Sequence, residues 1–292
     1  MPYQKYAGGG FPVDDLANAI WATGYPSYIN TCQSWTEDSW SSEANEGSLA
    51  QASGGGNSSA FMRAGGNTNS GRLSSCSSFN GSTWGAEASF SNSWYETGGD
   101  GIPTKFIQVS GVGGTCGTTT RCDECNTYNG TSWSSITSYT AATNGNAVGG
   151  NSDGCLSVGG ETSLATTESW NGSAWTSETH VGYDTAGGCC SGTGALNVYY
   201  CGTSAGVQQN ACSTFDGGTW TTQANASTYS RLSNRGGSGT SGAMRVGGRG
   251  GTGSGADYSY LDTTEVFQPS LTWSTKASIS AAVYQLIAGG GA

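Results

Sequence analysis

The sequence has few charged side chains, and few of those are basic. Charged residues make up 10% of the 292-residue chain, with 10 Lys and Arg against 20 Asp and Glu, so the formal net charge is −10. A nucleic-acid-binding surface needs the opposite balance, because Lys and Arg make most contacts to phosphate. We therefore expect no nucleic acid among the partners.

Long apolar runs are also missing. No segment approaches the roughly 20 apolar residues that a membrane-spanning helix needs. The opening segment MPYQKYAGGG has neither the basic region nor the apolar core of a secretory signal. The sequence therefore predicts no membrane insertion and no standard signal peptide.

Histidine is nearly absent, which limits the catalytic chemistry. His180 is the only histidine in the sequence, and no nucleophile motif surrounds it as a Ser-His-Asp or Cys-His arrangement would require. The Gly-rich segment GGRGGTGSG (247–255) lacks the Gly-Lys-Ser/Thr ending of a phosphate-binding loop. We predict that the protein is not an enzyme and has no catalytic, cofactor-binding or metal-binding residues.

What the sequence does contain is a recurring phrase, of which SSFNGSTW (77–84) is one copy. Each copy ends in a Trp, and these residues are 42 to 53 positions apart: Trp40, Trp84, Trp133, Trp175, Trp220 and Trp273. Asn-Gly and Asp-Gly favour the positive φ angles of a two-residue type I′ turn, so the phrase predicts a β-hairpin. The hairpins are expected near residues 28–42, 74–86, 123–135, 165–177, 210–222 and 262–275.

Two further short strands precede each hairpin and often end in Gly-Gly. NAVGG and GCLSVGG, before the fourth hairpin, are examples. Four strands in a repeat of this length are typical of a propeller blade. The 10 Trp, 14 Tyr and 7 Phe residues argue against a disordered chain. The sequence predicts an all-β fold in which residues 1–292 form a single six-bladed β-propeller of four-stranded blades.

The order of these elements resembles a known family. A Gly-Gly strand end followed by an aromatic residue and then a Trp is the layout of kelch-type propeller repeats. In particular, VGG (158–160) with ESWNGSAW (168–175) is similar to the kelch-like repeats of bacteriophage virion and tail-associated proteins. Two repeats depart from the pattern, with TGY at 23–25 and CGT at 201–203.

The resemblance implies a non-enzymatic virion structural or host-attachment protein on a phage tail, fibre or capsid surface. Its partners would be other virion proteins, copies of itself, or a glycan or protein receptor on the host. Its location would be the virion, which is extracellular after host lysis. Two alternatives stay open: a carbohydrate-binding propeller of the lectin type, and a glycosidase.

The aromatic residues fall into repeated and unrepeated sets. One set shares a position in the predicted third strand: Trp35, Phe79, Tyr128, Trp170, Phe215 and Phe267. A side chain needed in every blade is needed by the architecture, so we expect this set and the hairpin Trp residues to pack between blades. The alternative is a ring of aromatic side chains that stack on sugars. The candidate ligand contacts lie outside the repeat: Trp21, Tyr25, Tyr28, Trp94, Tyr95, Tyr258 and Tyr260.

Ten cysteines are many for an intracellular protein. We aligned the third and fifth repeats on Cys125 with Cys212, each three residues before the third-strand aromatic. The alignment also matches Gly113 of the third repeat with Cys201 of the fifth, each taken as the first residue of the Gly-Gly site of its repeat.

This shared register places Cys201 opposite Cys212 and Cys116 opposite Cys122. We predict both disulfides, which belong in an oxidising environment such as the exterior of a virion. The register gives no partner to five other cysteines: Cys32, Cys76, Cys155, Cys189 and Cys190.

The two ends of the chain carry similar segments. YQKYAGGG (3–10) and YQLIAGGG (284–291) agree at six of eight positions, and both resemble the inner strand of a repeat. Burial of Lys5 is costly, whereas Leu286 and Ile287 are apolar. We expect the C-terminal copy to fill the inner position of the first blade, beside strands within residues 17–40, and to leave the N-terminal copy as an arm. The alternative is that the N-terminal copy keeps that position.

Overall fold

The computed structural model describes most of the chain, with short gaps. The described residues are 19–24, 28–36, 39–117, 119–162, 165–204, 207–231, 234–239, 242–251, 259–268, 272–280, 282 and 287–289. Their regular structure is β, apart from one 3-10 turn, η2 (Gly114–Cys116). No helix in these segments has the length and apolar character needed to cross a membrane. The all-β prediction is confirmed.

Most strands belong to six antiparallel sheets, in each of which four strands run in order from the inside to the outside of the molecule. The first sheet contains β32 (Ile287–Gly289), β1 (Ile20–Gly24), β2 (Ile29–Thr36) and β3 (Ser39–Ser42), and the second contains β4 (Ser53–Asn57), β5 (Ala60–Ala64), β8 (Cys76–Phe79) and β9 (Trp84–Glu87). The third contains β11 (Gly98–Ile102), β12 (Lys105–Gly113), β13 (Arg121–Tyr128) and β14 (Trp133–Ile136), with β10 (Trp94–Tyr95) also paired to β12.

The other three large sheets repeat this order. The fourth contains β15 (Ala147–Asn151), β16 (Gly154–Val158), β17 (Thr167–Trp170) and β18 (Trp175–Ser177). The fifth contains β19 (Cys189–Gly192), β20 (Asn197–Tyr200), β23 (Cys212–Phe215) and β24 (Trp220–Thr222). The sixth contains β26 (Asn234–Gly239), β27 (Gly242–Val246), β30 (Thr264–Gln268) and β31 (Thr272–Lys276).

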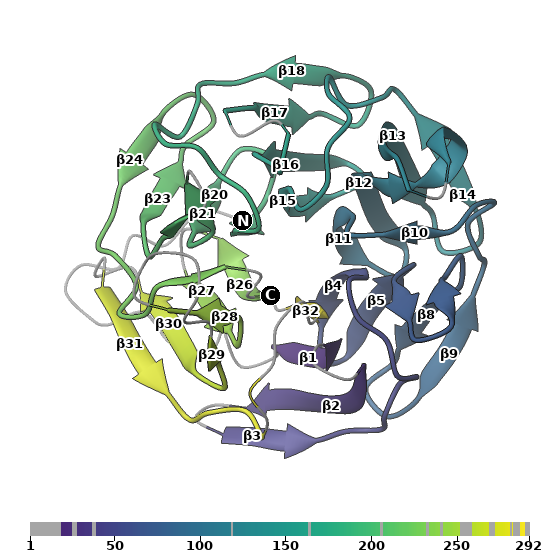
Figure 1. Ribbon diagram of the computed structural model, residues 1–292, viewed down its shortest axis with the longest axis horizontal. Coiled ribbons are helices and arrows are strands. Elements are labelled where there is room, and N and C mark those ends of the chain that lie inside the picture. Colours follow the sequence, from purple (N-terminus) through teal and green to yellow (C-terminus); the bar gives the residue numbers. More distant parts are fainter. Residues whose placement is uncertain are drawn as a thin grey trace, which may run out of the picture.

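The inner strands of the six sheets contact one another in a circuit. In order, β32 contacts β4, β4 contacts β11, β11 contacts β15, β15 contacts β19, β19 contacts β26, and β26 contacts β32. Figure 1 shows the sheets arranged around a common centre, with β3, β9, β14, β18, β24 and β31 at the rim. The sheets therefore follow one another around the centre in the order of the chain.

The first sheet joins segments from opposite ends of the chain. Strand β32 pairs antiparallel with β1, and Ala288 lies opposite Trp21. The expectation that the C-terminal copy fills the inner position of the first repeat is confirmed. The N-terminal copy, with Lys5, lies outside the described residues, as does Leu286.

Among the described residues the core is divided into six hydrophobic clusters, each formed between two neighbouring large sheets. Between the third and fourth sheets, for example, Ile107 and Val109 pack with Val148, Cys155 and Trp170. The cluster between the sixth and first sheets completes the series. Each sheet thus buries its apolar faces only against its two neighbours, as in other repeat architectures.

The repeated aromatic residues face one another across the outer two strands of each large sheet. The six cross-strand pairs are Trp35 with Trp40, Phe79 with Trp84, Tyr128 with Trp133, Trp170 with Trp175, Phe215 with Trp220, and Phe267 with Trp273. Their ring centroids are 5.0 to 5.4 Å apart. The third-strand member is buried and the outer Trp is half-buried in every pair.

Each outer Trp also bonds to the neighbouring repeat. Its indole Nε1 donates to the backbone carbonyl four residues after the Trp of the preceding repeat, at 2.8 to 3.2 Å. The donor and acceptor pairs are Trp84 to Ala44, Trp133 to Ala88, Trp175 to Thr137, Trp220 to Thr179, Trp273 to Ala224 and Trp40 to Ala277. These bonds, together with the six clusters, confirm the predicted packing role of the repeated aromatics.

The hairpin turns are longer than the sequence predicted. Because Phe79 pairs directly with Trp84, four residues connect the two strands. Asn80 Oδ1 accepts hydrogen bonds from the backbone N–H groups of Ser82 and Thr83 at 3.1 and 3.0 Å. The prediction of a two-residue type I′ turn is therefore wrong: that turn needs positive φ at both central residues, whereas Gly81 has positive φ and Asn80 does not. The side chain of Asn80 closes the turn.

Three other repeats use the same turn. Their acceptors are Asn129, Asn171 and Asp216. The glycine that follows each acceptor has a φ of 90° to 94°, including Gly81. The motif thus combines a side-chain acceptor with one glycine that must adopt positive φ.

The second strand of each repeat has a backbone kink at or near its end. A residue with φ between 51° and 66° precedes a glycine with φ between 100° and 151°. The six dipeptides are Thr23-Gly24, Gly65-Gly66, Ser110-Gly111, Gly159-Gly160, Cys201-Gly202 and Gly247-Gly248. In the third repeat the kink lies at Ser110, so the sequence alignment that placed it at Gly113 is wrong.

Candidate functional site

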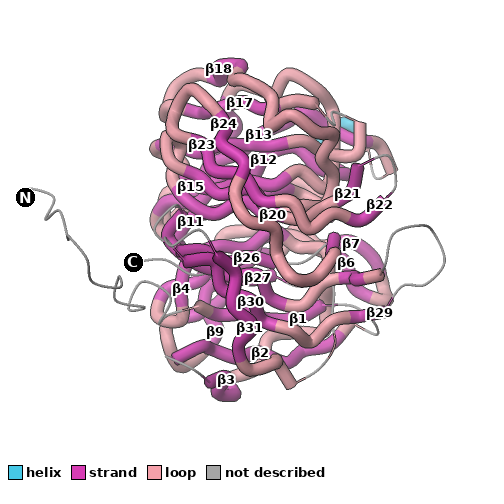
Figure 2. The backbone as a smooth tube through the Cα atoms, turned by 90° about the vertical axis from the view of Figure 1, so that its left-hand side faces the viewer, coloured by secondary structure: helices cyan, strands magenta, loops and turns pink. Residues whose placement is uncertain are grey.

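Three small sheets gather on one side of the molecule. They are β6 (Asn67–Thr68) with β7 (Gly71–Arg72), β21 (Thr203–Ser204) with β22 (Val207–Gln208), and β25 (Ser230–Arg231) with β28 (Arg249–Gly250) and β29 (Ser259–Tyr260). Figure 2 shows β6, β7, β21, β22 and β29 together on that side. We call it the loop face, because it is formed by connections between strands. Unlike the outer Trp residues, these connections differ from repeat to repeat.

Polar side chains form a continuous series of hydrogen bonds along these connections. The Asn67 amide donates to the Tyr28 hydroxyl at 3.4 Å and to Gln51 Oε1 at 3.3 Å. Gln51 Nε2 then donates to Glu96 Oε1 at 2.6 Å. Gln51 and Glu96 each lie two residues before an inner strand and have positive φ angles of 60° and 51°. The series therefore links residues of the first three repeats.

Glu96 stands in the middle of this series. Its second carboxyl oxygen accepts from Asn144 Nδ2 at 2.8 Å, and Asn144 Oδ1 accepts from Arg121 Nε. Arg121 is also paired with Glu161 at 2.9 Å. Burial, and secondly the negative charge of Glu161, raise the pKa of Glu96. The hydrogen bonds from Asn144 and Gln51 act in the opposite direction.

A pocket of about 380 Å³ lies beside this series. It is lined by Asn67, Gly71, Arg72, Ser93 and Tyr95. A Cβ atom added at Gly71 would meet nothing within 4 Å, so the space beside it is open. Small-molecule sites typically have volumes of about 300 to 1,000 Å³. The pocket therefore has the size of a site for a small molecule or one unit of a larger ligand.

A second hollow lies where the inner strands begin. The first residues of β4, β11, β15 and β19 line it, and its volume is about 80 Å³. That volume is well below the usual range for small-molecule sites. We therefore take the pocket on the loop face as the candidate binding site.

Arg72 and Tyr95 form the distinctive pair of that pocket. The guanidinium carbon of Arg72 lies 4.5 Å from the centroid of the Tyr95 ring, which is cation–π geometry. Arg63, Arg121 and Arg245 each have a glutamate partner. No carboxylate in the described part of the chain pairs with Arg72. Its hydrogen-bonding edge is therefore available to a ligand.

Two of the predicted ligand contacts are core residues. Trp21 is fully buried, and its indole donates to Gln33 Oε1 at 3.2 Å. Trp94 is 1% exposed and packs between the second and third sheets. Both predictions are wrong, because each Trp fills a position between sheets that the sequence pattern did not include in the repeat.

The other predicted contacts lie nearer the surface. Tyr95 lines the pocket, and Tyr28 reaches the pocket residue Asn67 through its hydroxyl group. Tyr260 is 41% exposed on β29. Tyr25 and Tyr258 lie outside the described residues. The sequence pattern did not identify Arg72 or Asn67. The available signal was that Arg72 is one of few basic residues and lies outside the repeated phrase.

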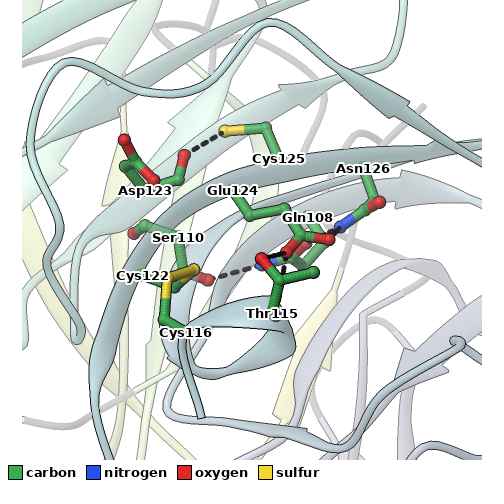
Figure 3. The surroundings of a disulfide bond; sticks show 9 residues. All are labelled: Gln108, Ser110, Thr115, Cys116, Cys122, Asp123, Glu124, Cys125 and Asn126. Atoms are coloured by element: carbon green, nitrogen blue, oxygen red, sulfur yellow. Dashed lines mark hydrogen bonds between the residues drawn. A yellow bond between two sulfur atoms is a disulfide. The ribbon is translucent and has the colours of Figure 1, made fainter.

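One predicted disulfide is present. Cys116 and Cys122 are bonded, with Cα atoms 5.6 Å apart (Figure 3). The 3-10 turn η2 brings Cys116 back toward β13, and Thr115 of this turn donates from its backbone N–H and hydroxyl to Glu124 Oε2 at 3.1 and 2.9 Å. The bond therefore ties the loop between β12 and β13, although Gly111 rather than Cys116 lies opposite Cys122 in the strand register.

The second predicted disulfide is wrong, since Cys201 and Cys212 are both free. Tyr200, not Cys201, lies opposite Cys212. Cys201 has a φ of 62° and turns the chain out of the strand. The corresponding residue of the third repeat is Ser110 rather than Gly113, so the register was displaced.

The remaining thiols are inside the protein. Eight cysteines are buried and form no disulfide: Cys32, Cys76, Cys125, Cys155, Cys189, Cys190, Cys201 and Cys212. Burial raises the pKa of both Cys32 and Cys125 to about 12. The thiolate is the reactive form of cysteine, so these thiols are chemically quiet near neutral pH.

One group of potential metal ligands occurs among the described residues, formed by Cys116, Cys122 and Asp123. Its two sulfur atoms are bonded to each other, so neither can act as a thiolate ligand. His180 lies between β18 and β19, and its Nδ1 accepts from the Gly182 N–H at 3.4 Å. This contact places the histidine in a local turn.

No protein-family model matches the chain, and no curated protein matches it significantly in sequence. Its function must therefore be inferred from its own residues.

Proposed function

We propose that the chain is a six-bladed β-propeller built from four-stranded, kelch-like blades. Six large sheets, six clusters between them and the circuit of inner-strand contacts support this architecture. The hydrogen bond from Trp40 to Ala277 joins the first and last repeats in the same manner as the other five. The antiparallel pairing of β1 with β32 joins the first and last described strands in one sheet.

We further propose that this propeller is a non-enzymatic virion component, acting as a structural or host-attachment protein of a phage tail, fibre or capsid surface. The observation that carries the proposal is the division of the molecule into a repeated scaffold and an unrepeated loop face. A rigid scaffold with variable surface loops suits recognition, because rigid elements position the loops. We propose the viral source because the repeats resemble phage kelch-like sequences.

The partners follow from that role. The loop face contacts either another virion protein, a second copy of the chain, or a receptor on the host surface. The excess of acidic over basic residues disfavours nucleic acid as a partner.

The test is fractionation of purified particles from the source. We expect the protein to co-sediment with intact particles in a density gradient and to be detected there by mass spectrometry. Soluble protein added in excess should also reduce adsorption of particles to host cells if it serves attachment. A protein that remains in the unsedimented fraction would rule out the virion role.

Carbohydrate binding is the second candidate function, and the pocket with Tyr95 and Arg72 favours it. An aromatic ring and several polar groups converge there, as in sites that recognise sugars through stacking and hydrogen bonds. A glycan array distinguishes a free-standing lectin from a structural subunit, since the lectin should bind sugars selectively without any association with particles. Turnover of a chromogenic sugar would instead indicate a glycosidase.

A further inference from the structure

The pocket on the loop face has an unusual charge environment. The chain carries a net charge of −10, yet Arg72 has no carboxylate partner among the described residues. The aromatic face of Tyr95 holds the guanidinium group by a cation–π contact, which leaves the planar N–H edge free. An arginine fixed by a ring rather than by an acid is prepared to bind an anion from outside.

The shape of the guanidinium group selects the kind of anion. Its parallel N–H groups match a carboxylate in a bidentate arrangement, which makes this contact both stronger and more specific than a neutral hydrogen bond. The other groups lining the pocket are neutral: the Ser93 hydroxyl, the Asn67 amide and the Tyr95 ring. Both amide hydrogens of Asn67 are directed to Tyr28 and Gln51, so its Oδ1 is the atom that can accept from a ligand hydroxyl.

From these features we propose that the pocket binds a sugar that carries a carboxylate, such as a uronic or nonulosonic acid unit of a surface polysaccharide. Arg72 would bind the carboxylate, while Asn67 and Ser93 would bond to ring hydroxyls. This inference deepens the proposed attachment role and rests on it for the source of the glycan. The chemistry of the pocket itself depends only on the residues named.

The decisive experiment uses an array of acidic oligosaccharides together with their carboxyl-reduced counterparts. The full-length protein should bind at least one uronic or nonulosonic acid glycan and bind its reduced form at least about tenfold more weakly, the loss expected for a charge-assisted hydrogen bond. Binding to neither kind of glycan would overturn the inference. Equal binding to the acidic and the reduced forms would overturn it as well.

Variants of the pocket identify the residues involved. Arg72→Gln should abolish the preference for the acidic glycan, and Arg72→Lys should retain part of it, because lysine keeps the charge but not the planar fork. Tyr95→Leu should weaken binding several-fold through loss of the ring that orients Arg72, whereas Tyr95→Phe should retain it. The melting temperature of each variant should stay near that of the parent, which separates lost binding from lost folding.

Lys105→Gln provides a matched control, since Lys105 is an exposed cation that already has the partner Asp153. We expect it to bind the acidic glycan like the parent protein. If Arg72→Gln and Lys105→Gln behave alike, the pocket is not the site. Particle fractionation is independent of these assays. A failed glycan preference would leave the virion proposal standing, and a protein that does not sediment with particles could still bind an acidic glycan.

Discussion

The rim of this protein shows the same contacts in every repeat, whereas the loop face differs from repeat to repeat. At the rim, every repeat contributes an aromatic pair and an indole hydrogen bond to the preceding repeat. On the loop face, one connection carries a disulfide, others carry small sheets, and one carries Arg72. The comparison teaches that repetition in this sequence marks architecture, whereas chemistry that could recognise a partner lies where repetition stops.

Removal of the closing strand should have the largest effect. Deletion of residues 283–292 takes away β32, leaves the inner edge of β1 unpaired, and removes the contacts of β32 with β4 and β26. We expect loss of the cooperative unfolding transition rather than a small decrease in stability, because each sheet is buried only by its neighbours. Thermal melting followed by near-ultraviolet circular dichroism measures this.

Deletion of residues 1–10 is the matched control, since it removes no described strand. It should leave the melting transition in place. If the N-terminal deletion abolishes folding and the C-terminal deletion does not, the pairing of β32 with β1 is not what holds the sheets together.

Disruption at the rim should come next. Trp175→Ala removes a half-buried indole together with its hydrogen bond to Thr137 and its contact with Trp170. The free energy of unfolding should fall by about 3 kcal/mol, the lower end for loss of a large aromatic side chain. Trp175→Phe keeps the ring contact and should cost about 1 kcal/mol. Urea denaturation measures both, and Tyr229→Ala, at an exposed tyrosine, should change little.

The disulfide on the loop face should matter less than the rim. Cys116 and Cys122 close a loop with a sequence separation of 6, for which the chain-entropy relation gives about 2 kcal/mol. The double variant Cys116→Ser with Cys122→Ser should lose that amount, and dithiothreitol should lower the stability of the parent protein but not of the variant. Equal sensitivity of the two proteins to the reductant would show that another thiol group is responsible.

The hairpin turn should show a smaller effect. Asn171→Ala removes the acceptor for the N–H groups of Ser173 and Ala174, both at the surface. We expect a loss of about 1 kcal/mol, the usual contribution of such hydrogen bonds. Asn171→Asp is the control, because Asp216 makes the same turn in the next repeat. A loss as large for Asp as for Ala would contradict the proposed role of the side-chain oxygen.

Alkaline pH should distinguish the interior cysteines from the bonded pair. Burial holds the pKa of Cys32 and Cys125 at about 12, above the ordinary value of 9.0. The unfolded chain ionises first, so stability is complete below pH 9 and falls as the pH rises toward 12. The decrease is at most about 1.4 kcal/mol per pH unit for each thiol. In denaturation curves at several pH values, Cys125→Ala should show a shallower decrease than the parent.

The parts of the fold that repeat were predictable from the sequence. The six Trp positions, the four-strand order and the use of the C-terminal copy for the first sheet are confirmed by the strand pairings. Periodic burial leaves a periodic trace in the sequence, so these features could be inferred without coordinates. The contrast between Lys5 in one copy and the apolar residues Leu286 and Ile287 in the other favoured the C-terminal copy.

The features that failed were local ones that break the repeat. The kink in the third repeat lies at Ser110. Its position could not be predicted, because a serine with positive φ leaves no glycine signal in the sequence. That displacement produced the wrong partner for Cys201. Trp94 was a candidate ligand contact because it lies outside the repeated motif, whereas an extra strand, β10, carries it into the core. Arg72 could be identified as a candidate binding residue only from the structure, which places it against Tyr95 and not against a carboxylate.

The pairing of β1 with β32 in the first sheet also has a consequence for folding during synthesis. Strand β32 follows every other described strand in the chain, so β1 has an unpaired edge until the ribosome has made the chain as far as residue 289. A waiting edge of this kind can pair with another nascent chain, which is a route to aggregation. The pairing of β32 with β1 also spans the greatest separation in sequence among the described strand pairs, and contacts between residues far apart in sequence form slowly. Yield in the cell should therefore depend on how quickly the last strand reaches the first.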